Sequence, residues 1–492
     1  MPTPAQSQIS LADGVSREYL LHHHVCPKLL ADNGQLVVAT APNAIRDALD
    51  DLSLAYRCTV VAEDATADEV ERLIERLTTR SERTIELARI ESDAGDDALA
   101  TDVRDLANQP PVVRYVNLLV RDAYDAGASD IHLEATRTGL SARFRLDGVL
   151  NPAPEPPSEL HHAVVSRIKL LAELDIAERR RPQDGRIRVR LESRELDLRV
   201  SSVPTMFGES VVLRLLDRGG RPVELEELGM SSEMLDTMTR LASRPHGMLL
   251  VTGPTGSGKT TTLYAALQRR GATTEKIITV EDPIEYQLGG VTQVPVHRQA
   301  GVTFGAALRS ILRQDPDVIM IGEMRDAETA EIAVQAAMTG HLVFSTLHTN
   351  DAIGAIPRLL DLGVPEYLIS ATLDGVLAQR LVRRICDGCH AEYAPNAASV
   401  ALLAGRPVGK KRLLRGAGCA ACRGTGFRGR VGIFELLVMT DELKDAINAH
   451  ASRSTLRSLA EEGGMRPLGS DGWRKIEAGL TTVEEVLRVV QQ

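Results

Sequence analysis

A glycine-rich segment that ends in lysine and threonine is the clearest chemical feature of this sequence. It reads GPTGSGKT, follows the apolar run 248–251 and precedes a helical pattern. In such a loop, backbone amides surround a β-phosphate at a helix N-terminus, the lysine neutralises β/γ charge, and the threonine hydroxyl ligates Mg²⁺. The sequence therefore predicts a nucleoside triphosphate site formed by Gly253, Pro254, Thr255, Gly256, Ser257, Gly258, Lys259, Thr260 and Thr261.

Acidic residues follow two apolar runs in the same part of the chain. Glu323 comes after the run 318–321, and Glu281 directly follows the run 277–280. Phosphoryl transfer to water needs one carboxylate that organises Mg²⁺ and another within reach of the attacking water. We assign Glu323 to Mg²⁺ through water and Glu281 to the attacking water, with Glu285 as the competitor of Glu281. The alternative for Glu323 is a solvated carboxylate at a strand end.

A histidine also stands at a strand end in this region. His348 lies just past the apolar run 342–346, in the sequence STLHTN. It could sense a γ-phosphate, although a single histidine can equally serve as a structural hydrogen-bond donor.

Four cysteines form two close pairs, Cys386/Cys389 and Cys419/Cys422. Four thiolates with this spacing are enough for a closed tetrahedral Zn²⁺ site, and a site without an open position is structural. Cys26 and Cys58 are interpreted as small buried hydrophobic residues. Basic residues surround the pairs and predict a solvated face, or one that meets anionic lipid or an acidic partner: Lys410, Lys411, Arg412, Arg415, Arg423, Arg428 and Arg430.

The periodicity of the sequence predicts an α/β protein of several domains. Apolar runs that alternate with helical patterns indicate a doubly wound, largely parallel sheet in the core, and ligands bind such sheets at the carboxyl ends of the strands. Thr482 and Glu485 fit a capping box that opens the last helix. The expected order is an α/β module at 1–85, an acidic linker at 86–110, a second α/β domain with arginine-rich strands at 111–222, the core at 223–385, the tetracysteine segment at 386–430 and a helical part at 431–492.

Composition narrows the function further. The chain has 492 residues, a formal net charge of -10 and 3% aromatic residues. Proteins that bind nucleic acids use basic surfaces to contact the phosphates and aromatic side chains to stack on the bases. We therefore do not expect nucleic acid as a partner. The sequence has no apolar stretch of about 18 residues, and its first residues lack the order of a signal peptide. We therefore expect a cytoplasmic location.

Four motifs together resemble those of the secretion-superfamily ATPases. GPTGSGKTTTLY, TVEDPIEY, RQDPDVIMIGEMRD and TGHLVFSTLHTN are similar to the Walker A motif, Asp box, Walker B motif and His box of that superfamily. The cysteine pairs, GTGFRGRVGIFELL and the tail GMRPLGSDGWRKIEAGLTTVEEVL resemble the type II secretion ATPases, the general secretion pathway protein E family. Type IV pilus assembly ATPases remain the alternative, whereas pilus retraction ATPases lack the cysteine segment.

The resemblance covers about residues 110–492 strongly and the N-terminal module more weakly. REYLLHHHVCP and LVVATAPNAIRDAL look like a partner-docking domain of the family. A single such module precedes the linker, and the RLG-rich repeats that bind cyclic di-GMP in some relatives are not apparent, so no such ligand is expected.

The resemblance implies a RecA-like P-loop core that hydrolyses Mg-ATP in a homohexamer and drives pseudopilus assembly and protein export. It implies partners in the inner-membrane platform, namely the cytoplasmic domain of the bitopic L-type component and the polytopic F-type component. Arg199 and Arg214 match arginines that approach the nucleotide, although they could simply solvate a strand face; Arg325 and Arg380 are further candidates. Two other functions stay open: a nucleic-acid translocase and a non-hydrolysing nucleotide-dependent scaffold.

Overall fold

The computed structural model divides the chain into two compact units, residues 1–146 with 150–217 and residues 147–149 with 218–492. It describes residues 17–30, 35–42, 44, 47–56, 58–67, 69–74, 108, 110–191, 194–217, 223–271, 274–404 and 412–490. The expected acidic linker lies outside the described residues except for positions 108 and 110, and so do Lys410 and Lys411.

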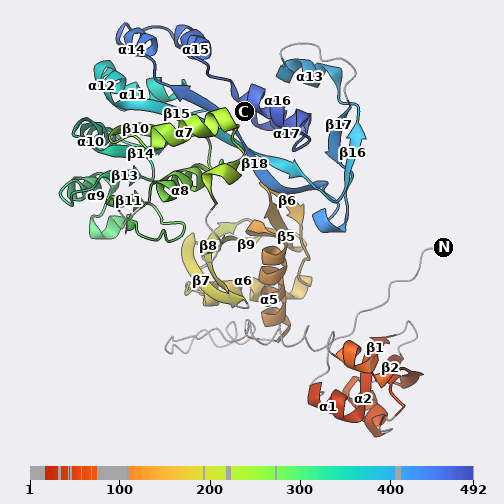
Figure 1. Ribbon diagram of the computed structural model, residues 1–492. Helices are drawn as coiled ribbons and strands as arrows, with labels where there is room; N and C mark the ends of the chain where they lie inside the picture. Colours follow the sequence, from red (N-terminus) through yellow and green to blue (C-terminus); the bar gives the residue numbers. More distant parts are fainter. Residues whose placement is uncertain are drawn as a thin grey trace. The chain divides into compact units, whose positions relative to one another are not determined.

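The N-terminal module is a small α/β fold (Figure 1). Its sheet has the order β1-β2-β3, with β1 antiparallel to β2 and β2 parallel to β3. Leu20, Leu36 and Leu52 are fully buried in its core. The elements are α1 (Arg17–His23), β1 (Val25–Leu30), β2 (Leu36–Thr40), α2 (Asp47–Tyr56) and β3 (Val60–Asp64).

The second module of the first unit is a six-stranded sheet of order β6-β5-β4-β9-β8-β7 with two main helices. Ile187 and Val189 on β7, and Leu196 and Leu198 on β8, join its core. On β7 the exposed Arg186, Arg188 and Arg190 alternate with these core residues, whereas the residue between Leu196 and Leu198 on β8 is the buried Asp197. The elements are α5 (Pro110–Asp125), β4 (Ala128–Thr136), β5 (Gly139–Leu146), β6 (Val149–Pro152), η1 (Ser158–Leu160), α6 (His161–Leu171), β7 (Gln183–Leu191), β8 (Arg194–Thr205) and β9 (Gly208–Asp217).

The second unit is built on a seven-stranded sheet of order β12-β11-β13-β14-β10-β15-β18. Every neighbouring pair is parallel except β15 and β18. These strands are β10 (Gly247–Thr252), β11 (Ile277–Glu281), β12 (Thr292–Pro295), β13 (Val318–Ile321), β14 (Leu342–Leu347), β15 (Leu373–Ile385) and β18 (Phe427–Val438).

Both faces of this sheet are buried by helices. On β10, Met248 and Leu250 join a core cluster with α9 and α10, whereas Leu249 and Val251 join a second cluster with α7 and α8. Successive residues of a strand face opposite sides, so the sheet is doubly wound as expected (Figure 1). The helices are η2 (Leu225–Leu228), α7 (Ser232–Ala242), α8 (Lys259–Arg270), η3 (Arg298–Ala300), α9 (Phe304–Ile311), α10 (Ala327–Met338), α11 (Ala355–Asp361) and α12 (Glu366–Thr372).

The C-terminal part differs from expectation in two places. The boundary expected after residue 430 falls inside β18, because this strand pairs with β15 from Gly375 to Ile385 and extends the core sheet. Thr482 does cap α17, accepting from Glu485 N–H at 3.4 Å, but the Glu485 carboxylate binds Arg383 instead of closing a capping box. The elements are β16 (His390–Tyr393), α13 (Ala397–Ala404), β17 (Leu413–Gly416), η4 (Ala420–Cys422), α14 (Asp441–Asn448), α15 (Arg453–Glu462), α16 (Leu468–Glu477) and α17 (Val483–Val490).

None of the helices in the described ranges combines the length and hydrophobicity that a membrane crossing requires.

Candidate nucleotide and metal sites

The glycine-rich loop connects the buried strand β10 to helix α8, as the motif requires. Gly253 and Gly258 have φ angles of 148° and 88°, which side chains rarely allow. A Cβ at Gly253 would lie 2.4 Å from the carbonyl oxygen of Gln379, and one at Gly258 would lie 2.8 Å from its Nε2. The loop therefore packs its backbone directly against β15, which leaves room for no side chain at these two positions.

Two polar groups of the loop fit a phosphate ligand. Lys259 Nζ donates to the carbonyl oxygens of Gly253 and Pro254 at 2.7 and 3.0 Å, so the ammonium lies across the loop. Burial lowers the pKa of Lys259 to about 8, against the opposing effect of Glu323 and with a further lowering by Arg380. The Ser257 hydroxyl is buried and has no hydrogen-bond partner among the described residues. An anion placed in the loop would satisfy both groups.

Glu323 and His348 lie at the same sheet edge as this loop. Strands β10, β14 and β13 are parallel neighbours, so their carboxyl ends coincide. Glu323 Oε2 is 3.6 Å from His348 Nε2, and its Oε1 is 2.6 Å from Arg325 Nε. Burial and the charge of Lys259 lower the pKa of His348, with Glu323 acting in the opposite direction. The structure thus brings Lys259, Glu323 and His348 together.

Glu281 ends strand β11 and is 2% exposed. Its Oε1 accepts hydrogen bonds from Thr279 Oγ1 at 2.5 Å and Gln293 Nε2 at 3.1 Å, and its Oε2 accepts one from the Tyr264 hydroxyl. To hold a water, Glu281 would have to exchange one of these partners. Glu285, four residues later, is half-buried on the following loop.

Gln379 and Arg380 lie on β15 beside the site, and sequence reasoning made no assignment for Gln379. Gln379 Oε1 accepts a hydrogen bond from Thr262 Oγ1 on α8 at 2.7 Å. Arg380 donates to the carbonyl and side-chain oxygens of Asn350 at 3.4 and 3.2 Å. A polar pair inside an apolar strand that follows a helix is the signal that could have indicated these residues.

Arg199 and Arg214 belong to the first unit. Arg199 on β8 pairs with Arg186 on β7 and with Arg214 on β9, so the three arginines form a row on one face of the sheet. Arg214 Nε donates to Asp130 Oδ1 at 2.9 Å, and the Asp130 side chain is 7% exposed while that of Arg214 is 59% exposed. The Arg214 guanidinium is therefore anchored at one end and open to solvent.

The four paired cysteines meet at one point, with all four sulfur atoms within 4.8 Å of one another. The Sγ separations are 3.9 Å for Cys386 and Cys419, and 3.7 Å both for Cys389 and Cys422 and for Cys419 and Cys422. Zn–S bonds of about 2.3 Å in a tetrahedron place sulfur atoms about 3.8 Å apart. The thiol cluster therefore fits Zn²⁺.

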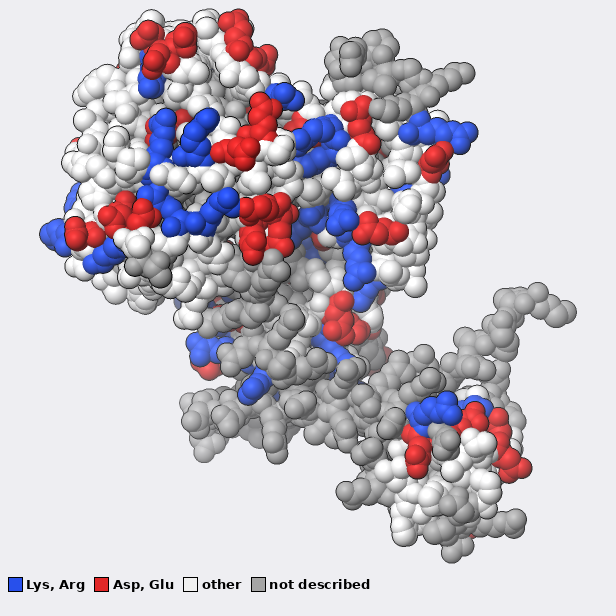
Figure 2. All heavy atoms as spheres, viewed as in Figure 1, with Lys and Arg blue, Asp and Glu red and all other residues white. Residues whose placement is uncertain are grey.

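Backbone amides support this cluster. Cys422 Sγ accepts from the N–H groups of Cys419 at 3.1 Å and Gly426 at 3.2 Å. Such bonds stabilise thiolate charge and orient the ligand. Arg412 of the surrounding basic segment pairs with Glu392, and the nearby Arg384 pairs with Asp387. Figure 2 shows basic and acidic side chains interspersed over the visible face of the second unit.

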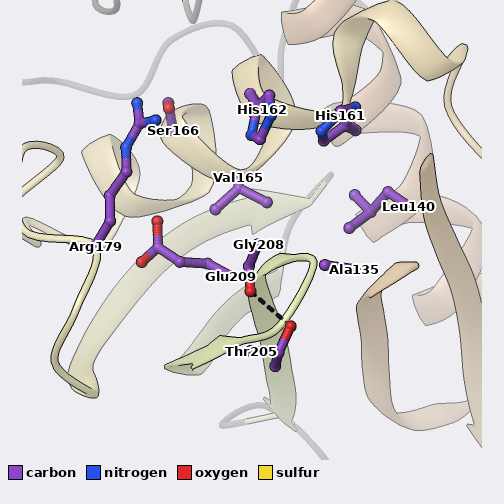
Figure 3. A pocket seen from close by; sticks show the side chains of 10 residues that line it. All are labelled: Ala135, Leu140, His161, His162, Val165, Ser166, Arg179, Thr205, Gly208 and Glu209. Carbon is purple, nitrogen blue, oxygen red and sulfur yellow. Dashed lines mark hydrogen bonds between the residues drawn. The ribbon is translucent and has the colours of Figure 1, made fainter. Parts of the chain in front are cut away.

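A cavity of about 90 Å³ lies in the first unit, between α6 and the turn that joins β8 to β9 (Figure 3). His161 and His162 line it with rings that are tilted by 47° to each other and have centroids 3.7 Å apart, and His161 Nδ1 lies 2.6 Å from the carbonyl oxygen of Ser158. Glu209 also lines it and forms a buried ion pair with Lys169 at 2.7 Å. The cavity contains none of the residues that the sequence assigned to nucleotide or metal.

Comparisons with known proteins agree with the motifs. Residues 105–488 match the family described as "Type II/IV secretion system protein". The chain is 47% identical over 486 residues to "Type II secretion system protein E" of Xanthomonas campestris pv. campestris, which covers 97% of this chain and 85% of the relative. It is 43% identical over 486 residues to "Type IV pilus assembly ATPase PilB" of Myxococcus xanthus. This match covers 96% of this chain and 85% of the relative. The crystal structure of the pilus retraction motor PilT with bound ADP is similar at a TM-score of 0.50 and 29% identity, covering 75% of this chain and 95% of that one.

Proposed function

Because the chain belongs to the Type II/IV secretion system protein family, we propose that it is the ATPase of a type II secretion system, which hydrolyses Mg-ATP to drive pseudopilus assembly and protein export. The observation that carries the proposal is the convergence of Lys259, Glu323 and His348 beside a glycine-rich phosphate loop. The identity of 47% to a type II secretion system protein E over 97% of the chain supports protein secretion as the process that hydrolysis drives.

The residues of the second unit divide the work of hydrolysis. The amides of loop 253–258 and the Lys259 ammonium hold the β- and γ-phosphates, and Lys259 exchanges its two carbonyl partners for them. The Thr260 hydroxyl and, through water, Glu323 would hold Mg²⁺, which would neutralise phosphate charge when bound. His348 contacts the γ-phosphate. Glu281 positions the attacking water, and Glu285 is its competitor because the carboxylate of Glu281 is already hydrogen-bonded.

Arg199 and Arg214 deliver positive charge to the nucleotide within a homohexamer. A guanidinium that crosses a mobile interface stabilises γ-phosphate charge only in the closed state, which couples hydrolysis to domain motion. The exposed end of Arg214 and its anchor on Asp130 are compatible with this role. Arg199→Ala and Arg214→Ala test this role, and Arg188→Ala is the control because Arg188 is exposed on the same sheet. A fall in turnover that the control does not show separates the role from a general effect of surface charge.

The tetracysteine cluster holds Zn²⁺ as a structural ion. We place the protein in the cytoplasm, attached to the inner membrane through the bitopic L-type and polytopic F-type components of the secretion platform. Anionic lipid is a further ligand for the exposed arginines near the cysteines, and nucleic acid is not a partner.

The test is steady-state phosphate release by the full-length protein with Mg-ATP, alone and with the cytoplasmic domain of the L-type component. We expect turnover that the partner stimulates, and loss of that stimulation when the N-terminal module, residues 1–85, is deleted. Binding of ATP without turnover in the presence of partner and lipid would support a scaffold instead. Stimulation by DNA or RNA would support a nucleic-acid translocase.

Type IV pilus assembly is the second candidate, because the chain is also 43% identical to PilB over 96% of its length. Expression in two deletion strains distinguishes the two outputs. Restored protein export in a strain that lacks its type II secretion ATPase supports our proposal, whereas restored piliation in a strain that lacks its pilus assembly ATPase supports the alternative.

A further inference from the structure

The loop after strand β14 joins the nucleotide site to the C-terminal helices. His348 begins this loop, and Thr349 ties it to the end of β10: Thr349 N–H donates to Thr252 Oγ1 at 2.9 Å, and the two hydroxyl oxygens are 2.7 Å apart. Thr252 directly precedes the phosphate loop. The backbone beside His348 therefore has a fixed relation to the place where the phosphates bind.

The other end of the loop is held by helix α15. The Asp351 carboxylate accepts Gly354 N–H at 2.8 Å and Arg453 at 3.0 and 2.8 Å, and Arg457 contacts it as well. Burial alone would raise the pKa of Asp351, but Gly354 N–H and the two guanidinium groups outweigh it and lower the pKa. Arg453 and Arg457 are four residues apart and so lie on one face of α15.

A second carboxylate fastens the same loop to helix α16. Glu435 on β18 is 2% exposed; its Oε1 accepts Ala352 N–H at 2.8 Å and its Oε2 accepts Leu468 N–H at 3.3 Å. Leu468 is the first residue of α16. Residues 348–354 are thus connected to β10 on one side and to two C-terminal helices on the other.

The His348 side chain depends on this loop for its position. Its Nε2 forms an ion-pair contact with Glu323 Oε2 at 3.6 Å, which is longer than an ordinary hydrogen bond. The ring is 45% exposed. The backbone of the loop therefore brings the ring to the place where it meets Glu323, and a displacement of the loop changes this contact.

We propose that Asp351 is a positioning residue for ATP hydrolysis, which acts through its ion pairs with Arg453 and Arg457 to hold His348 in place. Movement of α15 then changes turnover without changing the phosphate loop, so the C-terminal helices are a control point for the motor. This inference rests on the proposed role of His348 at the γ-phosphate.

The first experiment removes the two arginines from the full-length protein as Arg453→Ala with Arg457→Ala. We expect kcat to fall about fivefold or more while KM and the Kd for an ATP analogue stay within about twofold. The matched control is Arg474→Ala, because Arg474 on α16 pairs with Asp471 at 2.6 Å but does not contact the loop. A kcat of the double variant equal to that of the control, or a parallel loss of kcat, ATP affinity and Tm, would overturn the inference.

Asp351→Asn provides a second variant with less risk to folding, since the amide oxygen still accepts Gly354 N–H while the charge is lost. We expect the same fall in kcat as in the double variant. Lysine at both arginine positions keeps the charge and restores most of the rate. Parental kcat in Asp351→Asn would contradict the inference.

The third arm repeats the arginine changes in a His348→Ala background. If the arginines act through His348, they lower kcat no further there. A further fall of the same size would overturn the inference and leave the role of His348 intact. If the single variant His348→Ala has the parental kcat, both the role of His348 at the γ-phosphate and the inference about Asp351 are overturned.

Discussion

Glu323→Gln separates nucleotide binding from hydrolysis in this site. The Glu323 side chain is 14% exposed and lies 2.6 Å from Arg325 Nε and 3.6 Å from His348 Nε2. Glutamine has the same shape, so packing is kept while the charge that organises Mg²⁺ and water is removed. We expect kcat to fall roughly 10²-fold or more, which corresponds to about 2.7 kcal/mol of transition-state stabilisation.

Other properties should change little. The Arg325 side chain is 64% exposed, so its ion pair with Glu323 contributes only about 0–1 kcal/mol to folding. The phosphate loop keeps its contacts, so the Kd for ATP should stay within about threefold at neutral pH. The Glu323 charge raises the pKa of Lys259. Its loss therefore lowers that pKa further, and ATP affinity of the variant should begin to weaken at a lower pH than in the parent.

Phosphate release measured beside equilibrium binding of a fluorescent ATP analogue tests this reasoning. Glu328→Gln is the matched control, because Glu328 on α10 pairs with Arg309 at 2.5 Å and is 51% exposed. Its kcat should equal that of the parent. Turnover of Glu323→Gln at the parental rate, or loss of ATP binding in proportion to turnover, would refute the assignment of Glu323 to metal and water.

Three further predictions concern the lysine and the cysteines. Lys259→Ala should abolish turnover through lost phosphate contacts, and an unchanged kcat would contradict the site. Since the Lys259 pKa is lowered to about 8 and phosphate binding requires its cationic form, ATP should bind best below that pH and weaken about tenfold by about pH 9, with proton uptake that calorimetry in two buffers detects. Cys389→Ser should lower the zinc content and Tm while ATP binding persists; a parent protein without zinc in a metal assay would exclude the zinc site.

Local patterns in the sequence predict most of the nucleotide site. The phosphate loop is contiguous, and the strands beside it are apolar runs that carry no charge until they end, so β10, β11, β13 and β14 were expected at the observed positions. Because such strands are parallel, acids that follow them must meet at one edge. The cysteine cluster is also predictable from local sequence, because the two cysteines of each pair are only three residues apart and can bind one metal ion together.

Burial at Glu281 could not be read from the sequence. A glutamate after an apolar run gives the same pattern whether it faces solvent or accepts hydrogen bonds from Tyr264 and Gln293. Strand β18 was also missed, because its first residues, FRGR, belong to the basic surroundings of the cysteines while its later ones pair with β15. In both cases the deciding partners belong to other elements of the fold.

Acidic residues of the C-terminal part show why such partners matter. Glu435, Asp471 and Glu485 are all buried, and each accepts a backbone N–H from another segment: Ala352, Phe434 and Arg383, at 2.8, 3.0 and 3.1 Å. A buried N–H without an acceptor is costly, so each carboxylate satisfies a strand or loop that cannot satisfy itself. Helices α16 and α17, which their sequence describes only as amphipathic, therefore complete the hydrogen bonding of β18 and β15, and Glu435 on β18 does the same for the loop that carries His348. A displacement of these helices would break hydrogen bonds of the ATPase core itself, so the C-terminal helices and the core sheet are expected to move together.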